Sequence, residues 1–144
     1  MDEVVKTEKG MLRGIDLGAN LEEIKKAESA HISEESPDYL FYEFPVDSTN
    51  NYTIAYTLEN NSLNEIRADI YVTNDTIAKT LCESFISYFS KRYKEPQKEN
   101  NVLWSWLTLY NNTSVRIELM DESADYHHVG KLSLIIYKEP DMAM

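Results

Sequence analysis

The sequence predicts an α+β fold in which two helices pack on one face of a roughly six-stranded, largely antiparallel sheet. Two helix-like stretches and six short runs of alternating apolar and polar residues favour this class. The order of one helix followed by a three-stranded meander also occurs twice, with little sequence identity between the two copies. We therefore interpret residues 1–144 as a single domain with pseudo-repeat halves at 11–73 and 74–138.

The first half begins with MLRGIDLGAN (11–20), which is typical of a short strand and a glycine turn, and continues into a helix at LEEIKKAESA. Asn20 is placed to cap this helix, with Glu23 three residues later as its reciprocal partner. Alternating apolar residues then predict three strands, at YLFYEF (39–44), YTIAYTL (52–58) and LNEIRADIYV (63–72). Polar links rich in asparagine separate them, as expected for turns.

The second half opens with the clearest helix, NDTIAKTLCESFISYFSKRY (74–93), capped by Asn74 or Asp75. Its apolar stripe contains Ile77, Leu81, Phe85 and Phe89, and it directs Cys82 toward the core. The basic cluster KRYKEPQK (91–98) fits a helix end, where cations complement the helix dipole. Three more strands are expected at VLWSWLTL (102–109), SVRIELM (114–120) and KLSLIIYK (131–138).

The charge of the chain is negative and unevenly placed. The formal net charge is −11, of which −9 falls in residues 1–74 and −2 in residues 75–144. This balance disfavours nucleic acid as a partner, and it is compatible with a basic protein partner or with simple solubility. No apolar run is long enough for a membrane span. We expect a cytoplasmic protein if the chain is full length, and an envelope or secreted protein if a leader was removed.

Residues that could carry chemistry are few. The stretch ADYHHVGKL (124–132) contains His127 and His128, but adjacent residues of a strand project to opposite faces, so we expect a solvated hairpin. The single cysteine excludes an internal disulfide. No glycine-rich phosphate loop, nucleophile elbow or zinc-protease motif occurs. The sequence therefore predicts no catalytic residue, no metal site and no cofactor, and an enzyme is not expected.

The second face of the sheet is the main candidate for function. If the helices cover the face containing Leu40, Ile54, Ile66, Ile70, Leu103, Leu107, Ile117, Leu119, Leu132 and Leu134, aromatic and charged residues remain on the other. Trp, Tyr and Arg dominate binding hot spots. The candidate partner-binding residues are therefore Tyr39, Phe41, Tyr71, Trp104, Trp106, Arg116 and Tyr137. The alternative is that both tryptophans belong to the core, with the face assignment inverted in their strand, or that loops cover them.

The stretch RGIDLGANLEEIKKAE resembles the opening of small envelope lipoprotein domains such as the BamE (SmpA) family. The doubled order of a helix and a meander is similar to that of the beta-lactamase inhibitor protein family, whose concave aromatic sheet grips its target, although this chain lacks the disulfides of that family. The resemblance covers about sixteen residues in motif and otherwise only the order of elements. It implies a non-catalytic scaffold that works by contact.

These observations favour a protein–protein interaction module that binds through the aromatic sheet face. It could be an envelope component, or an acidic inhibitor or immunity protein that masks a basic toxin. The alternative is a small-molecule carrier, whose pocket between the sheet and the long helix would be lined by Tyr42, Tyr52, Tyr56, Phe85 and Phe89. The partner and the oligomeric state are left open.

Overall fold

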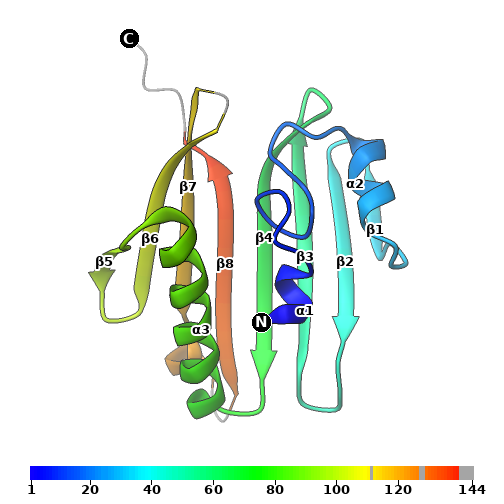
Figure 1. Cartoon of the computed structure of the whole chain (residues 1–144). Coiled ribbons are helices and arrows are strands. Elements are labelled where there is room, and N and C mark those ends of the chain that lie inside the picture. Colours follow the sequence, from blue (N-terminus) through cyan, green and yellow to red (C-terminus); the bar gives the residue numbers. More distant parts are fainter. Residues whose placement is uncertain (111, 127–128, 140–144) are drawn as a thin grey trace.

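The computed structural model describes residues 1–110, 112–126 and 129–139. Within these ranges the chain forms one open antiparallel sheet of eight strands (Figure 1). The strands are β1 (Glu34–Ser36), β2 (Tyr39–Pro45), β3 (Asn51–Glu59), β4 (Ser62–Val72), β5 (Gln97–Asn100), β6 (Leu103–Tyr110), β7 (Thr113–Asp121) and β8 (Gly130–Lys138). Their order across the sheet is β1-β2-β3-β4-β8-β7-β6-β5, so β4 and β8 pair at the centre.

The predicted six-stranded α+β fold is wrong, because the chain is built mainly from this larger sheet. Of the described residues, 46% lie in strands and only 24% are helical. The strands that the sequence did not indicate are β1 and β5, at the two edges. Both consist of polar residues, EES and QKEN, and so lack the apolar alternation that identifies a half-buried strand. The end of the basic cluster at 91–98 therefore belongs to β5 rather than to a helix end.

Three α-helices are described, and local sequence accounts for the ends of the two longer ones. They are α1 (Asp2–Val5), α2 (Leu21–Ala27) and α3 (Asp75–Tyr93), together with a short 3₁₀ turn, η1 (Ser123–Asp125). The predicted capping box is present in α2, where Asn20 and Glu23 each accept a hydrogen bond from the other's backbone N–H. Asn74, not Asp75, caps α3 by accepting from the N–H of Ile77. No helix in the described ranges has both the length and the apolar character to cross a membrane.

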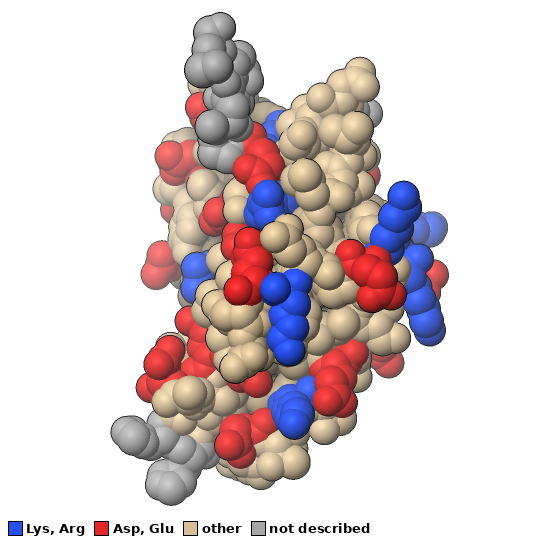
Figure 2. Space-filling view, turned by 90° about the vertical axis from the view of Figure 1, so that its left-hand side faces the viewer, with Lys and Arg blue, Asp and Glu red and all other residues tan. Residues whose placement is uncertain are grey.

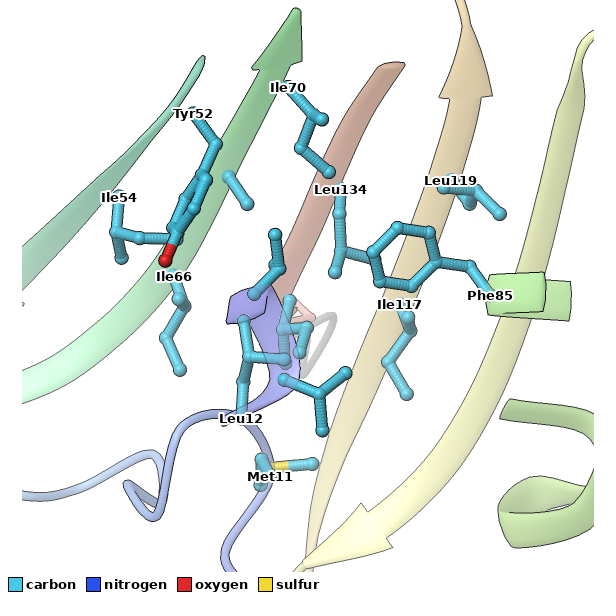
Figure 3. Packing of buried hydrophobic residues seen from close by; sticks show 14 of the residues in the cluster. Met11, Leu12, Tyr52, Ile54, Ile66, Ile70, Phe85, Ile117, Leu119 and Leu134 are labelled. Atoms are coloured by element: carbon cyan, nitrogen blue, oxygen red, sulfur yellow. The ribbon is translucent and has the colours of Figure 1, made fainter. Parts of the chain in front are cut away.

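The helices and the N-terminal segment cover one face of the sheet, here called the helix face (Figure 1). Residues 11–20 form turns with one isolated bridge, Leu12 to Ile15, instead of the predicted strand. Figure 3 shows Met11 and Leu12 of this segment, and Phe85 of α3, packed over the apolar side chains of the central strands. Gly130 starts β8 where α3 begins, and an added Cβ there would lie 2.3 Å from the carbonyl oxygen of Asn74.

The face assignment predicted for β6 is wrong by one residue. Cross-strand pairing places Trp104 beside Leu119 and Trp106 beside Ile117, so both indoles lie on the helix face. Leu103 and Leu107, expected in the core, lie on the opposite face. The strand is apolar on both sides, so its sequence contains no alternation that could fix the register. In the long helix the stripe also differs, because Ile77 is exposed and Ala78 is buried in its place.

Candidate functional site

The face of the sheet opposite the helices, here called the open face, is the candidate site. The cross-strand register defines its three central rows. They are Tyr39-Thr57-Glu65-Tyr137-Arg116-Leu107, then Phe41-Ala55-Arg67-Ile135-Glu118-Ser105, then Glu43-Thr53-Asp69-Ser133-Met120-Leu103. The core-forming residues of α1, α2 and α3 all pack on the other side. None of the described α-helices covers the open face, and apart from the segment around η1 at one end its surface consists of strand side chains.

An aromatic pair occupies the β2 side of the open face. The rings of Tyr39 and Phe41 are stacked, with centroids 6.4 Å apart and planes 7° from parallel. Both side chains are half-buried against the neighbouring strands. These two predicted site residues thus form one preassembled apolar surface, which a partner could cover with little loss of side-chain entropy.

A second group of predicted site residues lies on β8 and β7. Three strand spacings, roughly 14 Å, separate β8 from the aromatic pair on β2. Here Tyr137 pairs with Arg116 across the strands and donates a hydrogen bond from its hydroxyl to Glu118, at 2.7 Å. Burial and this hydrogen bond raise the pKa of Tyr137 above its ordinary value. Arg116 forms an ion pair with Glu139. Two more predicted residues are therefore neighbours, held in place by carboxylates.

The fifth predicted residue on this face, Tyr71, belongs to a cluster around a buried lysine. The ammonium of Lys131 lies 2.8 Å from Asp69 and 2.9 Å from Glu122, and 5.3 Å from the ring centre of Tyr71. Tyr126 closes the cluster with its ring edge against Tyr71. Burial disfavours the charge of Lys131, but its two carboxylate partners outweigh burial and raise its pKa. The cluster fixes the segment containing η1 over one end of the open face.

The charges of the open face leave an acidic excess. Its cations are already paired, Arg67 with Asp69, Lys131 with Asp69 and Glu122, and Arg116 with Glu139. Glu65 lies in the row that begins at Tyr39 and forms no ion pair with any described residue. Because each cation is neutralised by a carboxylate of the same face, the unpaired carboxylates give the open face a net negative charge toward an approaching molecule.

The two remaining predicted site residues, Trp104 and Trp106, are not part of this surface. Trp106 is 2% exposed, its ring centre lies 5.3 Å from that of Phe89, and its indole N–H donates to the carbonyl oxygen of Lys94 at 3.1 Å. Trp104 is partly buried against the same core, with the ammonium of Lys98 5.6 Å from its ring centre. The indoles belong to the core, as in the alternative interpretation of the sequence.

A second buried polar cluster, which no sequence pattern predicted, lies on the helix face. The guanidinium of Arg13 donates to both oxygens of Glu28, at 2.6 and 2.9 Å, and the hydroxyl of Tyr56 also donates to Glu28, at 2.6 Å. Arg13 also donates to the backbone carbonyl oxygens of Glu3 and Val4, both in α1. Arg13, Glu28 and Tyr56 are distant in sequence, and Arg13 lies in a turn, so no helical or strand periodicity in the sequence indicates the cluster. The cluster fastens the N-terminal segment to α2 and β3.

Burial and hydrogen bonding act in opposite directions on this cluster. Burial would raise the pKa of Glu28, but the hydrogen bonds from Arg13 and Tyr56 outweigh it and lower the pKa below the ordinary glutamate value. Burial, with the nearby charge of Glu28, raises the pKa of Tyr42 to about 12. The hydroxyl of Tyr42 is buried without a hydrogen-bond partner among the described residues.

The residues of the predicted carrier pocket fill space instead of enclosing it. Tyr42, Tyr52, Tyr56, Phe85 and Phe89 are each 8% exposed or less. Phe85 and Phe89 stack on each other, with ring centres 6.3 Å apart. Tyr42 and Tyr56 meet edge to face at 6.0 Å. These contacts give the carrier alternative no specific support.

Metal chemistry and the histidine pair add little to the site. Within residues 1–110, 112–126 and 129–139, no three His, Cys, Asp or Glu side chains are grouped so that they could hold a metal ion. His127 and His128, predicted to lie in a hairpin, fall outside the described residues. Cys82 is buried, as predicted, and burial raises the pKa of its thiol to about 12.

No family model, curated protein or solved structure matches the chain. The resemblance to small envelope domains and to the beta-lactamase inhibitor proteins therefore stays an expectation, and the function must be argued from the surface itself.

Proposed function

We propose that this chain is a non-catalytic protein–protein interaction module that binds its partner through the open face. The observation that supports this is a large pleated surface without a covering helix, on which aromatic and apolar side chains are held half-buried. A sheet face that only faces water usually carries polar side chains. Here Tyr39 and Phe41 lie at one side, and Ile135 and Tyr137 lie near the centre.

The charge of the face favours a basic partner. The face keeps an acidic excess after its own cations are paired, and the whole chain has a net charge of −11. Such a surface attracts a positively charged protein over a distance and speeds its capture. Among the expected roles, an acidic inhibitor or immunity protein that masks a basic target is therefore the one that we favour over an envelope component.

The experiment is capture of host proteins on the immobilised chain at low and high salt. The double substitution Tyr39→Ala with Phe41→Ala removes the aromatic pair, and Glu65→Lys reverses the unpaired charge in the row that begins at Tyr39. We expect each variant to lose the captured partner, and high salt to weaken capture by the unmodified chain.

The matched control is Ile77→Ala, which removes an exposed apolar side chain from α3, away from the open face. It should capture the partner as the unmodified chain does. Capture that is unchanged by both open-face variants, or lost equally in the control, would show that binding does not use this face.

A further inference from the structure

We propose that two copies of this chain pair antiparallel along the outer edge of β6, with a twofold axis beside Thr108, to join two eight-stranded sheets into one. This proposal concerns the edge of the sheet and does not depend on the partner proposed for the open face. It is carried by an unpaired strand edge, by exposed leucines on that edge and by a sequence that is complementary to itself.

The outer edge of β6 is covered along only part of its length. β5 pairs with Leu103, Trp104 and Ser105 and with no later residue of β6. Before β5, the chain turns toward the helix face, where Lys94 accepts the hydrogen bond from the Trp106 indole. From Leu107 onward, no described strand lies beside β6 on its outer side.

The backbone of this free edge offers hydrogen-bonding groups. Tyr110 pairs with Thr113 at the end of a hairpin with two residues between them, and in such hairpins the last pair is hydrogen-bonded inward. Inward and outward bonding alternate along an antiparallel strand. Leu107 and Leu109 therefore direct their N–H and C=O groups outward, where no described strand receives them.

The side chains of this edge are apolar and exposed. Leu107 is 58% exposed and Leu109 is 71% exposed, the highest values among the large apolar residues described. Natural proteins usually protect a free edge with a charge, a proline or a bulge, and residues 106–110, WLTLY, contain none of these. Figure 2 shows this side of the molecule, with charges of both signs across its middle and a mainly uncharged region toward the upper end.

The sequence of the edge identifies a second copy as the occupant. The segment reads aromatic-Leu-Thr-Leu-aromatic, which is symmetric about Thr108. An antiparallel pair centred there places Leu107 opposite Leu109 of the other copy, and Leu109 opposite its Leu107. These two pairs exchange four backbone hydrogen bonds, and Thr108 faces its own symmetry mate. A closed twofold contact of this kind needs a self-complementary surface, which this segment provides.

A hollow borders the start of the free edge. This hollow, of about 300 Å³, lies between the residues that precede β5 and the start of the free edge, and Glu95, Ser105, Leu107 and Arg116 are among its lining residues. The paired segment itself carries no charge, so the net charge of each copy repels the other only at a distance.

Cross-linking tests the register directly. Thr108→Cys places two cysteines in a non-hydrogen-bonded pair with Cα atoms about 4.5 Å apart, within disulfide range. In Leu107→Cys the two introduced cysteines are diagonal neighbours across the strand pair, with Cα atoms about 7–8 Å apart, which is too far for a disulfide. Under mild oxidation we expect a covalent dimer from Thr108→Cys and not from Leu107→Cys, and the buried Cys82 should not cross-link. A Thr108→Cys chain that stays monomeric, or a Leu107→Cys chain that cross-links as well, would overturn the proposal.

Sedimentation over a wide concentration range tests the association itself. The unmodified chain should approach twice its 16.7 kDa mass, and more readily in high salt, because salt screens the repulsion between two acidic copies. Leu109→Lys should weaken the dimer about tenfold or more, since it puts like charges on a strand edge. Val46→Lys, at another exposed apolar position, should dimerise normally. A chain that is monomeric throughout overturns the proposal. The open-face variants Tyr39→Ala and Phe41→Ala should leave the mass unchanged, which separates this test from that of the proposed function.

Discussion

Replacing Trp106 with alanine tests whether its indole belongs to the core or to a binding surface. The side chain is 2% exposed, packs on Phe89 and donates its N–H to Lys94. Truncation of a buried tryptophan costs about 3–5 kcal/mol, because it removes transfer free energy and leaves a cavity. About 1 kcal/mol of this is expected from the lost hydrogen bond and about 1 kcal/mol from the aromatic pair.

Urea unfolding followed by circular dichroism measures this loss. The urea concentration at the unfolding midpoint should fall, with little change in the dependence of unfolding free energy on urea. The melting temperature should drop by about 10 °C, at roughly 3 °C for each kcal/mol in a chain of this size. Trp106→Phe keeps a packed ring and should lose only about 1–2 kcal/mol. Trp104→Ala, at a partly buried position, should lose roughly 1–2 kcal/mol. A loss below about 1 kcal/mol for Trp106→Ala would refute the core assignment and return the indole to the surface.

Three further predictions concern buried polar groups. Glu28→Gln should destabilise the chain by about 3–5 kcal/mol, because the charge of Arg13 stays buried without its partner. Because folding lowers the pKa of Glu28, the difference in unfolding free energy between Glu28→Gln and the unmodified chain should be full above pH 4.5, the ordinary pKa, and should shrink as the pH falls below it. A difference in unfolding free energy that grows on acidification would contradict this. Iodoacetamide should label Cys82 only in denaturant, because the thiol is buried with a pKa of about 12, and rapid native labelling would disprove it. In urea unfolding, Lys131→Met should cost about 1–3 kcal/mol, against about 0.5 kcal/mol or less for the exposed control Lys79→Met; equal losses would argue against the carboxylate cluster.

Local patterns predicted those parts of the fold in which one physical signal dominates. The capping box at Asn20 and Glu23 is confirmed, because its two hydrogen bonds need only three residues of spacing. The alternation in β3 is confirmed at Tyr52, Ile54 and Tyr56, which are all buried, because small or polar residues, Thr53 and Ala55, separate them. In β6 both faces are apolar, so pattern alone could not choose between them, and the tryptophans were assigned to the wrong side.

The same limits apply to the candidate site. Tyr71, on β4 with its clear alternation, lies on the open face where the pattern placed it, and so does Tyr39 on β2. The ion pairs that organise this face could not be predicted, because each needs the register between distant strands. Lys131 meets Asp69 only through the pairing of β4 with β8, 62 residues apart in the chain. The edge strands β1 and β5 left no apolar signal at all.

The central position of β8 has a consequence for how the sheet is completed during synthesis. It joins β4 to β7, yet it is the last of the described strands to leave the ribosome. Until β8 is made, the meander that ends in β4 and the one that ends in β7 each have an unpaired inner edge. Each edge can pair wrongly with another nascent chain. Premature termination before residue 130 should therefore yield insoluble product instead of a smaller stable domain.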